Sequence, residues 1–216
     1  MRITRVGMQA AVVATAAVVA SALSAAPAAA HGKTQPGTRS LAAVLTADKS
    51  GFDRNGNDFD VLTAAVQAVL KAKPSSPVGV LADGGTALTA FIPNDRAFER
   101  LVADIQRTRC LPSESKAFTA VAGLGIDTVE AVLLYHVVPG STIDRKAALK
   151  SDGAALKTAT GASIKVDVYG HRHKRIALID ADRSDRNPRV VRFDINKGNK
   201  QIAHAIDRVL RPSDLP

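Results

Sequence analysis

The chain has 216 residues, and 46% of them are apolar, a content that supports a hydrophobic core and excludes a disordered protein. Aromatic residues make up only 4% and tryptophan is absent, so the core is expected to consist mainly of Val, Leu, Ile and Ala. The formal net charge of +9 excludes an acidic protein and favours anionic partners.

The first thirty residues have the pattern of a secretory signal peptide. Two arginines lie within the first five residues, and an uncharged run rich in Ala and Val occupies residues 10–23. The small residues at 28–30 are typical of a cleavage site. A permanent membrane anchor is the alternative, but this run is weakly apolar and ends at the cleavage signal. We therefore expect residues 1–30 to be removed, which leaves a mature chain that begins at His31.

The expected mature chain is still basic. Cleavage removes two of the 29 basic residues and no acidic residue, so the formal charge falls from +9 to +7. No later segment has the length and apolar content of a membrane span. These features predict a protein that is secreted, either extracellular or associated with the cell wall, and without a membrane span after removal of the signal.

Cys110 is the only cysteine, so the fold cannot depend on an intrachain disulfide. We expect a monomer in which this thiol is partly buried beside Leu111. A dimer linked through Cys110 is the alternative.

Helical patterns dominate the first half of the mature chain. Residues 31–57 are expected to be a polar linker with a short packing segment, in which residues 41–45 form a helical turn. Spacing of apolar residues and helix-ending residues then predicts the following elements. They are a helix between Asp58 and Pro74, a loop at 77–85, a strand at 88–92, a helix from Asn94 or Asp95 to Ile105, and a third helix after Asp127.

The motif Asp53-x-Asn55-x-Asn57-Asp58 resembles the start of a calcium-binding loop. Its sixth position is Asp58 instead of Gly, and its twelfth position is Ala64 instead of Glu. We interpret the motif as a turn in which Asp58 caps the following helix. The sequence therefore predicts no metal site and no cofactor.

The C-terminal part of the chain has the period of β-strands. Apolar residues alternate with polar ones between Ser163 and Tyr169, as in a half-exposed antiparallel strand. Strands are predicted at residues 154–158, 163–169, 175–180, 190–195 and 201–210. Because helices come first and strands later, the pattern favours an α+β fold.

Three segments together resemble the fasciclin domain family. They are residues 89–98 (TAFIPNDRAF), 133–140 (LLYHVVPG) and 199–212 (NKQIAHAIDRVLRP). Lys200 replaces the usual turn glycine, and residues 107–125 are longer and more polar than the family pattern. The resemblance implies a fasciclin-like wedge of two β-sheets flanked by α-helices, which we place at residues 58–213.

The resemblance also implies a non-enzymatic role in cell adhesion or in extracellular matrix and cell-surface interaction. The sequence contains no Gly-x-Ser-x-Gly elbow, His-Glu-x-x-His motif or phosphate-binding Gly-rich loop, so no catalytic residue is predicted. The expected partner is a cell-surface or matrix protein, or an anionic polysaccharide. A secreted binding protein for an acidic polymer or a small apolar ligand is the alternative function.

Two residue pairs are candidates for partner contact by this resemblance. Tyr135-His136 and Asp194-Ile195 match segments that are linked to integrin recognition in animal relatives. Apolar residues flank the first pair on both sides, which favours a buried, hydrogen-bonded histidine over a ligand contact. The bacterial character of the signal peptide makes an integrin an unexpected partner for this chain.

A basic cluster is the candidate polyanion contact. Its residues are His171, Arg172, His173, Lys174, Arg175 and Arg189, and Arg183, Arg186 and Arg192 extend it. If these loops converge, they attract acidic polysaccharide or anionic cell-wall polymer. Few aromatic residues are interleaved, so specific nucleic-acid binding is not predicted. The alternative is a solvated hairpin whose charge is partly neutralised by Asp180, Asp182 and Asp185.

Overall fold

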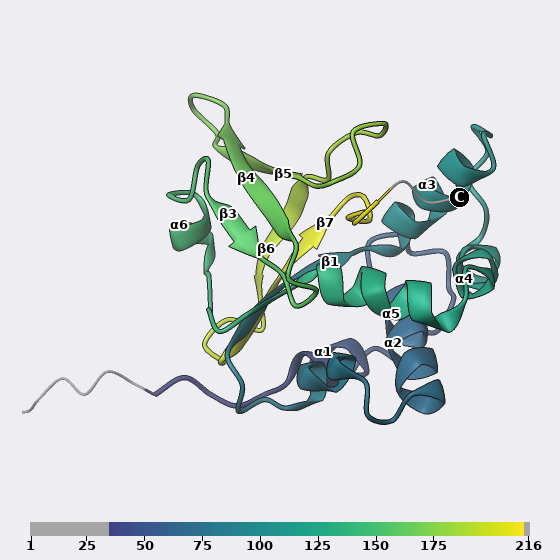
Figure 1. Ribbon diagram of the computed structural model, residues 1–216, viewed down its shortest axis with the longest axis horizontal. Coiled ribbons are helices and arrows are strands. Elements are labelled where there is room, and N and C mark those ends of the chain that lie inside the picture. Colours follow the sequence, from purple (N-terminus) through teal and green to yellow (C-terminus); the bar gives the residue numbers. More distant parts are fainter. Residues whose placement is uncertain (1–34, 214–216) are drawn as a thin grey trace, which may run out of the picture. The chain divides into compact units, whose positions relative to one another are not determined.

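The computed structural model describes residues 35–213, and helices fill the first half of this range (Figure 1). The signal peptide expected for residues 1–30 lies outside the described residues. The helices are α1 (Leu41–Leu45), α2 (Asp60–Ala72), the 3₁₀ helix η1 (Pro77–Ala82), α3 (Asp95–Ile105), α4 (Glu114–Gly123), α5 (Ile126–Tyr135) and the short α6 (Arg145–Ala148).

Between residues 35 and 213, seven strands form two sheets. The larger sheet has the order β2-β1-β7-β6 and the smaller one the order β3-β4-β5. The strands are β1 (Leu88–Pro93), β2 (Val137–Pro139), β3 (Ala155–Lys157), β4 (Ser163–Tyr169), β5 (Arg175–Ile179), β6 (Val190–Ile195) and β7 (Gln201–Ile206). Helices and two sheets together confirm the predicted α+β class.

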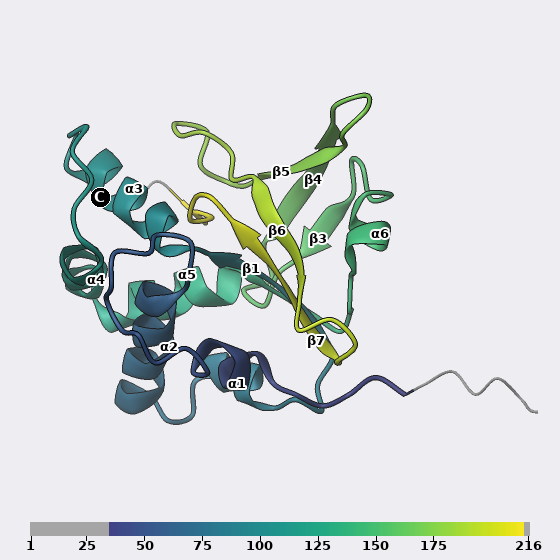
Figure 2. The same cartoon turned by 180° about the vertical axis from the view of Figure 1, so that it is seen from behind.

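The centre of the larger sheet is the parallel pair β1 and β7, in which Leu88 is opposite Gln201 and Pro93 is opposite Ile206. Both strands are buried along their whole length. Alternate side chains of a strand point to opposite faces, so Ile92 packs with the helices and Phe91 packs with the smaller sheet. Figures 1 and 2 show helices α1–α5 on one side of β1 and β7, and strands β3–β5 with the short α6 on the other.

The start of α2 is capped from another helix and not by Asp58, so that prediction was wrong. Phe59 occupies the N-cap position and makes no side-chain cap hydrogen bond. The carboxylate of Asp95, the first residue of α3, instead accepts hydrogen bonds from the backbone N–H groups of Asp60 and Val61, at 3.0 and 2.9 Å. This long-range cap fixes the start of α2 against α3.

Three other segments differ from the sequence-based expectation. Residues 107–125 contain α4, whose apolar side chains Ala117 and Val121 reach the core. The loop expected at 77–85 contains η1, and α6 was not predicted.

The predicted helical turn at residues 41–45 is α1, which packs its buried leucines into the helical core.

Candidate interaction surfaces

Tyr135 and His136 lie at the end of α5, where the chain turns into β2. The Tyr135 side chain is completely buried, and His136 is 4% exposed. The Tyr135 hydroxyl donates to the backbone carbonyl of Ser163 at 3.3 Å and thereby joins α5 to β4. Burial, followed by the nearby Asp180 carboxylate, raises the pKa of Tyr135. Neither ring offers a surface that a partner protein can reach.

Two backbone hydrogen bonds determine the protonation of His136. Its Nδ1 lies 2.7 Å from the carbonyl oxygen of Val132 and therefore carries the proton. Its Nε2 accepts a 2.9 Å hydrogen bond from the N–H of Leu210. Burial lowers the pKa of His136 to about 4, although the hydrogen bond to Val132 opposes this shift. His136 is therefore neutral at pH 7 and connects α5 to the chain beyond β7.

Asp194 and Ile195 end strand β6 in an irregular backbone. Asp194 and Asn196 have left-handed φ values of 61° and 65°, and the β6–β7 register shifts between Arg192 and Ile195. Such a bulge redirects side chains relative to a regular strand. Ile195 turns toward the helical core, and Asp194 remains partly exposed.

The Asp194 carboxylate is held by two neighbours. It accepts hydrogen bonds from the backbone N–H of Arg145 at 2.7 Å and from the Lys197 ammonium group at 2.6 Å. Burial acts to raise the pKa of Asp194, but these hydrogen bonds outweigh it and keep the pKa below its ordinary value. Asp194 is thus an ionised carboxylate that already has partners within the fold.

His204 is a buried histidine that the sequence analysis did not single out. Its Nδ1 accepts a 3.2 Å hydrogen bond from the N–H of Asp194, and its Nε2 donates to the carbonyl of Ile143 at 2.8 Å. Burial lowers its pKa. The ring also packs edge-on against Phe193, with 5.4 Å between centroids. His204 therefore supports the Asp194 segment from behind.

Residues 171–175 form the exposed tip of the β4–β5 hairpin. In the part of the chain that the structure describes, none of Arg172, Lys174 and Arg175 forms an ion pair. His171 and His173 are exposed beside them. The tip therefore presents three permanent positive charges to solvent.

The other basic residues of the predicted cluster lie elsewhere. Arg183, Arg186 and Arg189 are on the β5–β6 connection, which forms a loop separate from the hairpin tip in both views (Figures 1 and 2). The Arg189 guanidinium lies 6.0 Å from the centroid of the Tyr169 ring, and Arg192 lies 5.1 Å over Phe59. The cluster is thus divided into several smaller groups.

Acidic residues of the β5–β6 connection pair with the C-terminal segment, not with the hairpin. Asp182 and Asp185 form ion pairs of 3.2 Å with Arg211, and Arg208 joins Asp185 at 3.1 Å. Asp180 accepts a hydrogen bond from the backbone N–H of Arg211 at 2.8 Å. These acids therefore leave the charge of the hairpin tip without neutralisation.

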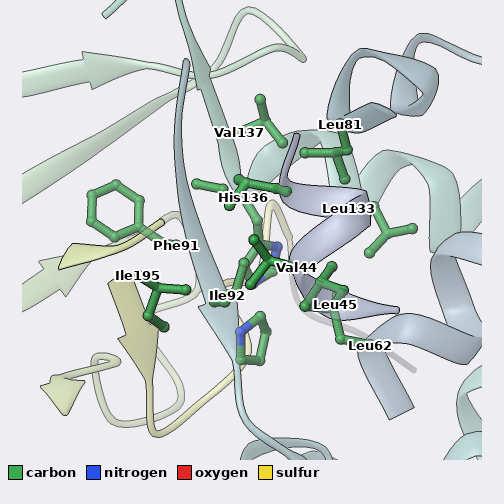
Figure 3. Close-up of a pocket in the computed structure, with 13 residues that line it drawn as sticks. Val44, Leu45, Leu62, Leu81, Phe91, Ile92, Leu133, His136, Val137 and Ile195 are labelled. Atoms are coloured by element: carbon green, nitrogen blue, oxygen red, sulfur yellow. The ribbon is translucent and has the colours of Figure 1, made fainter. Parts of the chain in front are cut away.

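Two small apolar cavities lie among the helices and the larger sheet, and each measures about 20 Å³. Figure 3 shows the first, where Leu45, Ile92, His136 and Ile195 converge from four different elements. Each cavity has room for about one water molecule, whereas pockets for small organic ligands measure roughly 300–1,000 Å³. They are packing defects of the core and not ligand sites.

Cys110 is exposed, and the expectation of a partly buried thiol was wrong. The neighbouring Leu111 is 42% exposed. The chain leaves the core after α3, at Arg107 with its left-handed φ of 52°, and returns only at Glu114. The thiol therefore lies on a surface loop.

No single helix in residues 35–213 is long and apolar enough to cross a membrane. Helices α4 and α5 reach the required length and hydropathy only together, across a bend of 108°.

Comparison with known proteins gives one family and a set of similar structures. The fasciclin domain model matches residues 59–212. A FAS1 domain pair from the insect cell adhesion molecule Fasciclin I has a similar fold, with a TM-score of 0.55 and 17% sequence identity over 81% of this chain. The match covers 51% of that structure, so this chain spans about half its length. No curated protein matches the sequence. With most of its length matched by the family model, the chain belongs to the fasciclin domain family.

Proposed function

We propose that this protein is a secreted, non-enzymatic module that acts in cell adhesion or in matrix and cell-surface interaction through contacts on its surface. Its membership of the fasciclin domain family carries the proposal, because this domain occurs in adhesion proteins. The burial of Tyr135 and His136 supports a contact surface elsewhere on the domain. The partly exposed Asp194 segment is a candidate for that surface.

An adhesion assay on cells of the source organism tests this proposal. Beads that carry the purified protein should retain these cells, and beads that carry heat-denatured protein should not. Mass spectrometry of the culture medium should find a mature N-terminus at or near His31. If native and denatured protein retain cells equally, the adhesion function is excluded.

Binding of an anionic polymer is the second candidate function, and the hairpin tip supports it. Arg172, Lys174 and Arg175 are exposed and make no ion pair within the described residues. An acidic polysaccharide that binds this tip releases counterions, so affinity falls steeply as salt rises. Screening over about 8 Å at physiological ionic strength also weakens such an exposed contact.

Chromatography on immobilised heparin or an anionic wall polymer tests the second candidate. Wild-type protein should bind at low salt and elute as the ionic strength approaches the physiological range or slightly exceeds it. Changing Arg172, Lys174 and Arg175 to Ser should lower the elution salt. A control with three exposed lysines from other elements changed to Ser matches the loss of charge; these are Lys71, Lys116 and Lys150. Equal elution of both triple variants would exclude the hairpin as the contact.

A further inference from the structure

Three helix starts bring acidic residues into one small region of the fold. Asp60, Asp95 and Glu114 are the first residues of α2, α3 and α4. Asp53 and Asp58 lie in the loop before α2. Asp58, Asp95 and Glu114 each place one carboxylate oxygen within 4.8 Å of the other two. Asp53, Asp58 and Asp60 form a second such group, so Asp58 belongs to both.

Several of these carboxylate oxygens are buried without a hydrogen-bond partner. Glu114 is 2% exposed, and its Oε1 has no partner. Its Oε2 accepts one hydrogen bond, of 3.1 Å, from the backbone N–H of Arg54. Asp58 is 9% exposed, and within residues 35–213 no N–H or hydroxyl group donates to either of its oxygens; the only polar neighbour in hydrogen-bond reach is the Asp95 carboxyl group. A buried ionised group is strongly destabilising unless a counter-charge and hydrogen bonds compensate it.

Among the described residues, no basic side chain supplies that counter-charge. Within residues 35–213, no Lys or Arg forms an ion pair with Asp58, Asp95 or Glu114. The nearby Arg96 pairs with Glu99, at 3.3 Å. Burial and a side-chain hydrogen bond with Asp58 raise the pKa of Asp95 to about 8. A proton shared by Asp58 and Asp95 is the alternative way to reduce the buried negative charge. It leaves Oε1 of Glu114 without a partner.

We propose that Asp58, Asp95 and Glu114 bind one calcium ion. Calcium takes six to eight oxygen ligands at roughly 2.3–2.6 Å, and oxygens on opposite sides of one ion are then about twice that distance apart. One oxygen of each residue lies within 4.8 Å of the other two, so all three can reach a single ion. The group contains only oxygen donors, which suit calcium better than zinc or copper. Asp53 and Asp60 lie close enough to Asp58 to add charge or water-mediated contacts.

The loop that carries Asp58 is fixed in place by the start of α3. The Asp58 carbonyl accepts a hydrogen bond from the N–H of Asp95 at 3.1 Å, and the Gly56 carbonyl accepts one from Arg96 at 2.9 Å. A Cβ atom at Gly56 would lie 2.9 Å from Nε of Arg96, so glycine permits this close approach. Asp58 and Asp95 are therefore positioned relative to each other before an ion arrives.

A surface pocket gives access to the group. It has a volume of about 350 Å³, and Asp48, Asn55, Asn57 and Asp58 contribute polar groups to its wall. Asp58 lies in the wall between this pocket and the buried carboxylates of Asp95 and Glu114, and its own carboxylate oxygens are buried. The rest of the wall consists of Arg192 and the apolar side chains of Val44, Leu45, Phe59 and Ile195, so a cation would enter along the four polar residues. A bound ion would connect the loop before α2 to α3 and α4.

Thermal unfolding and titration calorimetry of the purified protein test this site after removal of metals with EDTA. Dissociation constants of extracellular calcium modules are about 10⁻⁴–10⁻³ M. At 10 mM, calcium should then raise the Tm by about 3–8 °C. Magnesium, which requires a stricter octahedral geometry at shorter distances, should raise it less. Sodium chloride of matched ionic strength should not reproduce the shift.

Substitutions in the group provide the specific test. Asp58→Asn and Glu114→Gln should abolish the calcium-dependent shift and the calorimetric heat. Asp53→Asn, in an exposed residue, should keep the fold and lower the affinity several-fold. Asp167→Asn removes the same charge from the exposed face of β4 and should respond to calcium as the wild type does.

Three results would overturn the proposal. The first is the absence of a calcium-dependent heat and Tm shift in the wild type. The second is a magnesium response equal to the calcium response. The third is a calcium response equal to that of the wild type in the Asp53→Asn variant and also in the Asp58→Asn or the Glu114→Gln variant. If acidification from pH 8 to pH 5 stabilises the wild type and calcium does not, Asp58 and Asp95 share a proton instead.

Discussion

The imidazole of His136 accepts a 2.9 Å hydrogen bond from the backbone N–H of Leu210, 74 residues further along the chain. The same ring donates to the Val132 carbonyl. One neutral histidine therefore satisfies two backbone groups that belong to different parts of the fold. This arrangement gives the Tyr-His segment of the fasciclin domain a structural task in this protein.

Replacing His136 with alanine should lower the free energy of unfolding by roughly 1–3 kcal/mol. The change leaves the buried N–H of Leu210 and carbonyl of Val132 without these partners, and it removes packing inside the core. Urea unfolding at pH 7.5 measures the loss, and His171→Ala at the exposed hairpin tip serves as the control. A His136→Ala variant that unfolds like the wild type but loses adhesion would show that the ring is a ligand contact.

The depressed pKa of His136 predicts a loss of stability in acid. The residue is neutral in the folded state down to a pKa of about 4, whereas in the unfolded chain it gains a proton near pH 6.5. Its contribution is therefore fully present above pH 6.5 and is lost as the pH falls toward 4. The loss amounts to roughly 3 kcal/mol over this window.

Comparison with a variant isolates this contribution, because other groups titrate in the same range. Burial of His204 lowers its pKa and acts in the same direction. Burial of Asp60 and Asp180 raises their pKa values to about 6 and acts in the opposite direction. The difference in unfolding free energy between wild type and His136→Ala should shrink between pH 7.5 and pH 4.5. A constant difference would contradict the assigned protonation state.

Local sequence patterns predicted those elements whose own residues determine them. Residues 163–169 and 190–195 were predicted as strands with the bounds that the structure has. The alternation between Ser163 and Tyr169 was visible because one face of β4 is buried and the other exposed. Helix α4 was not predicted, because its apolar residues are not concentrated on one face and therefore give no clear helical period.

Features that depend on residues far apart in sequence could not be predicted in this way. The cap of α2 comes from Asp95, so the local rule selected Asp58 incorrectly. The acidic group was invisible because Asp58, Asp95 and Glu114 are brought together only by the packing of three helices. Exposure of the tip at 171–175 agrees with its composition, but its separation from Arg183 and Arg186 depends on how the loops leave the smaller sheet.

Gln201 joins the N-terminal segment to the centre of the larger sheet, so its replacement by leucine should be strongly destabilising. Its side-chain NH₂ donates to the carbonyls of Val80 and Asp83, and its side-chain carbonyl accepts from the N–H of Leu41. Leucine removes these three hydrogen bonds and leaves the N–H of the buried Leu41 unpaired, whereas the carbonyls of Val80 and Asp83 keep hydrogen bonds from the backbone N–H groups of Asp83 and Thr86. We expect a loss of roughly 1–3 kcal/mol. Chemical denaturation measures the loss, and hydrogen exchange should show faster exchange at Leu41.

Replacing Gln201 with glutamate distinguishes the role of the side-chain acceptor from that of the side-chain donors. Gln201→Glu keeps the acceptor for Leu41 but replaces the two donors by a buried carboxylate, so it should also be destabilising. Gln106→Leu makes the same substitution at an exposed residue after α3; it is the control and should cost less. A Gln201→Leu variant as stable as this control would show that water replaces the lost hydrogen bonds.

Arg211 is the central member of the ion-pair network that joins the C-terminal segment to the β5–β6 connection. Its side chain is 8% exposed and pairs with Asp182, whose side chain is 2% exposed, at 3.2 Å. It also reaches Asp185 at 3.2 Å and Asp104 at 3.5 Å. Burial acts to raise the pKa of Asp182, but hydrogen bonds from Ser184 and the charge of Arg211 outweigh it and keep the pKa low.

Arg211→Met should therefore cost roughly 3–5 kcal/mol at pH 7, because it preserves most of the packing but leaves the carboxylate of Asp182 buried without its counter-charge. Arg186→Met, in an exposed residue without an ion pair among residues 35–213, should change stability by less than about 0.5 kcal/mol. Adding Asp182→Asn to Arg211→Met should recover part of the loss, since the buried charge is then absent. If Arg211→Met is as stable as Arg186→Met, the network contributes only to the geometry of the C-terminal segment and not to its stability.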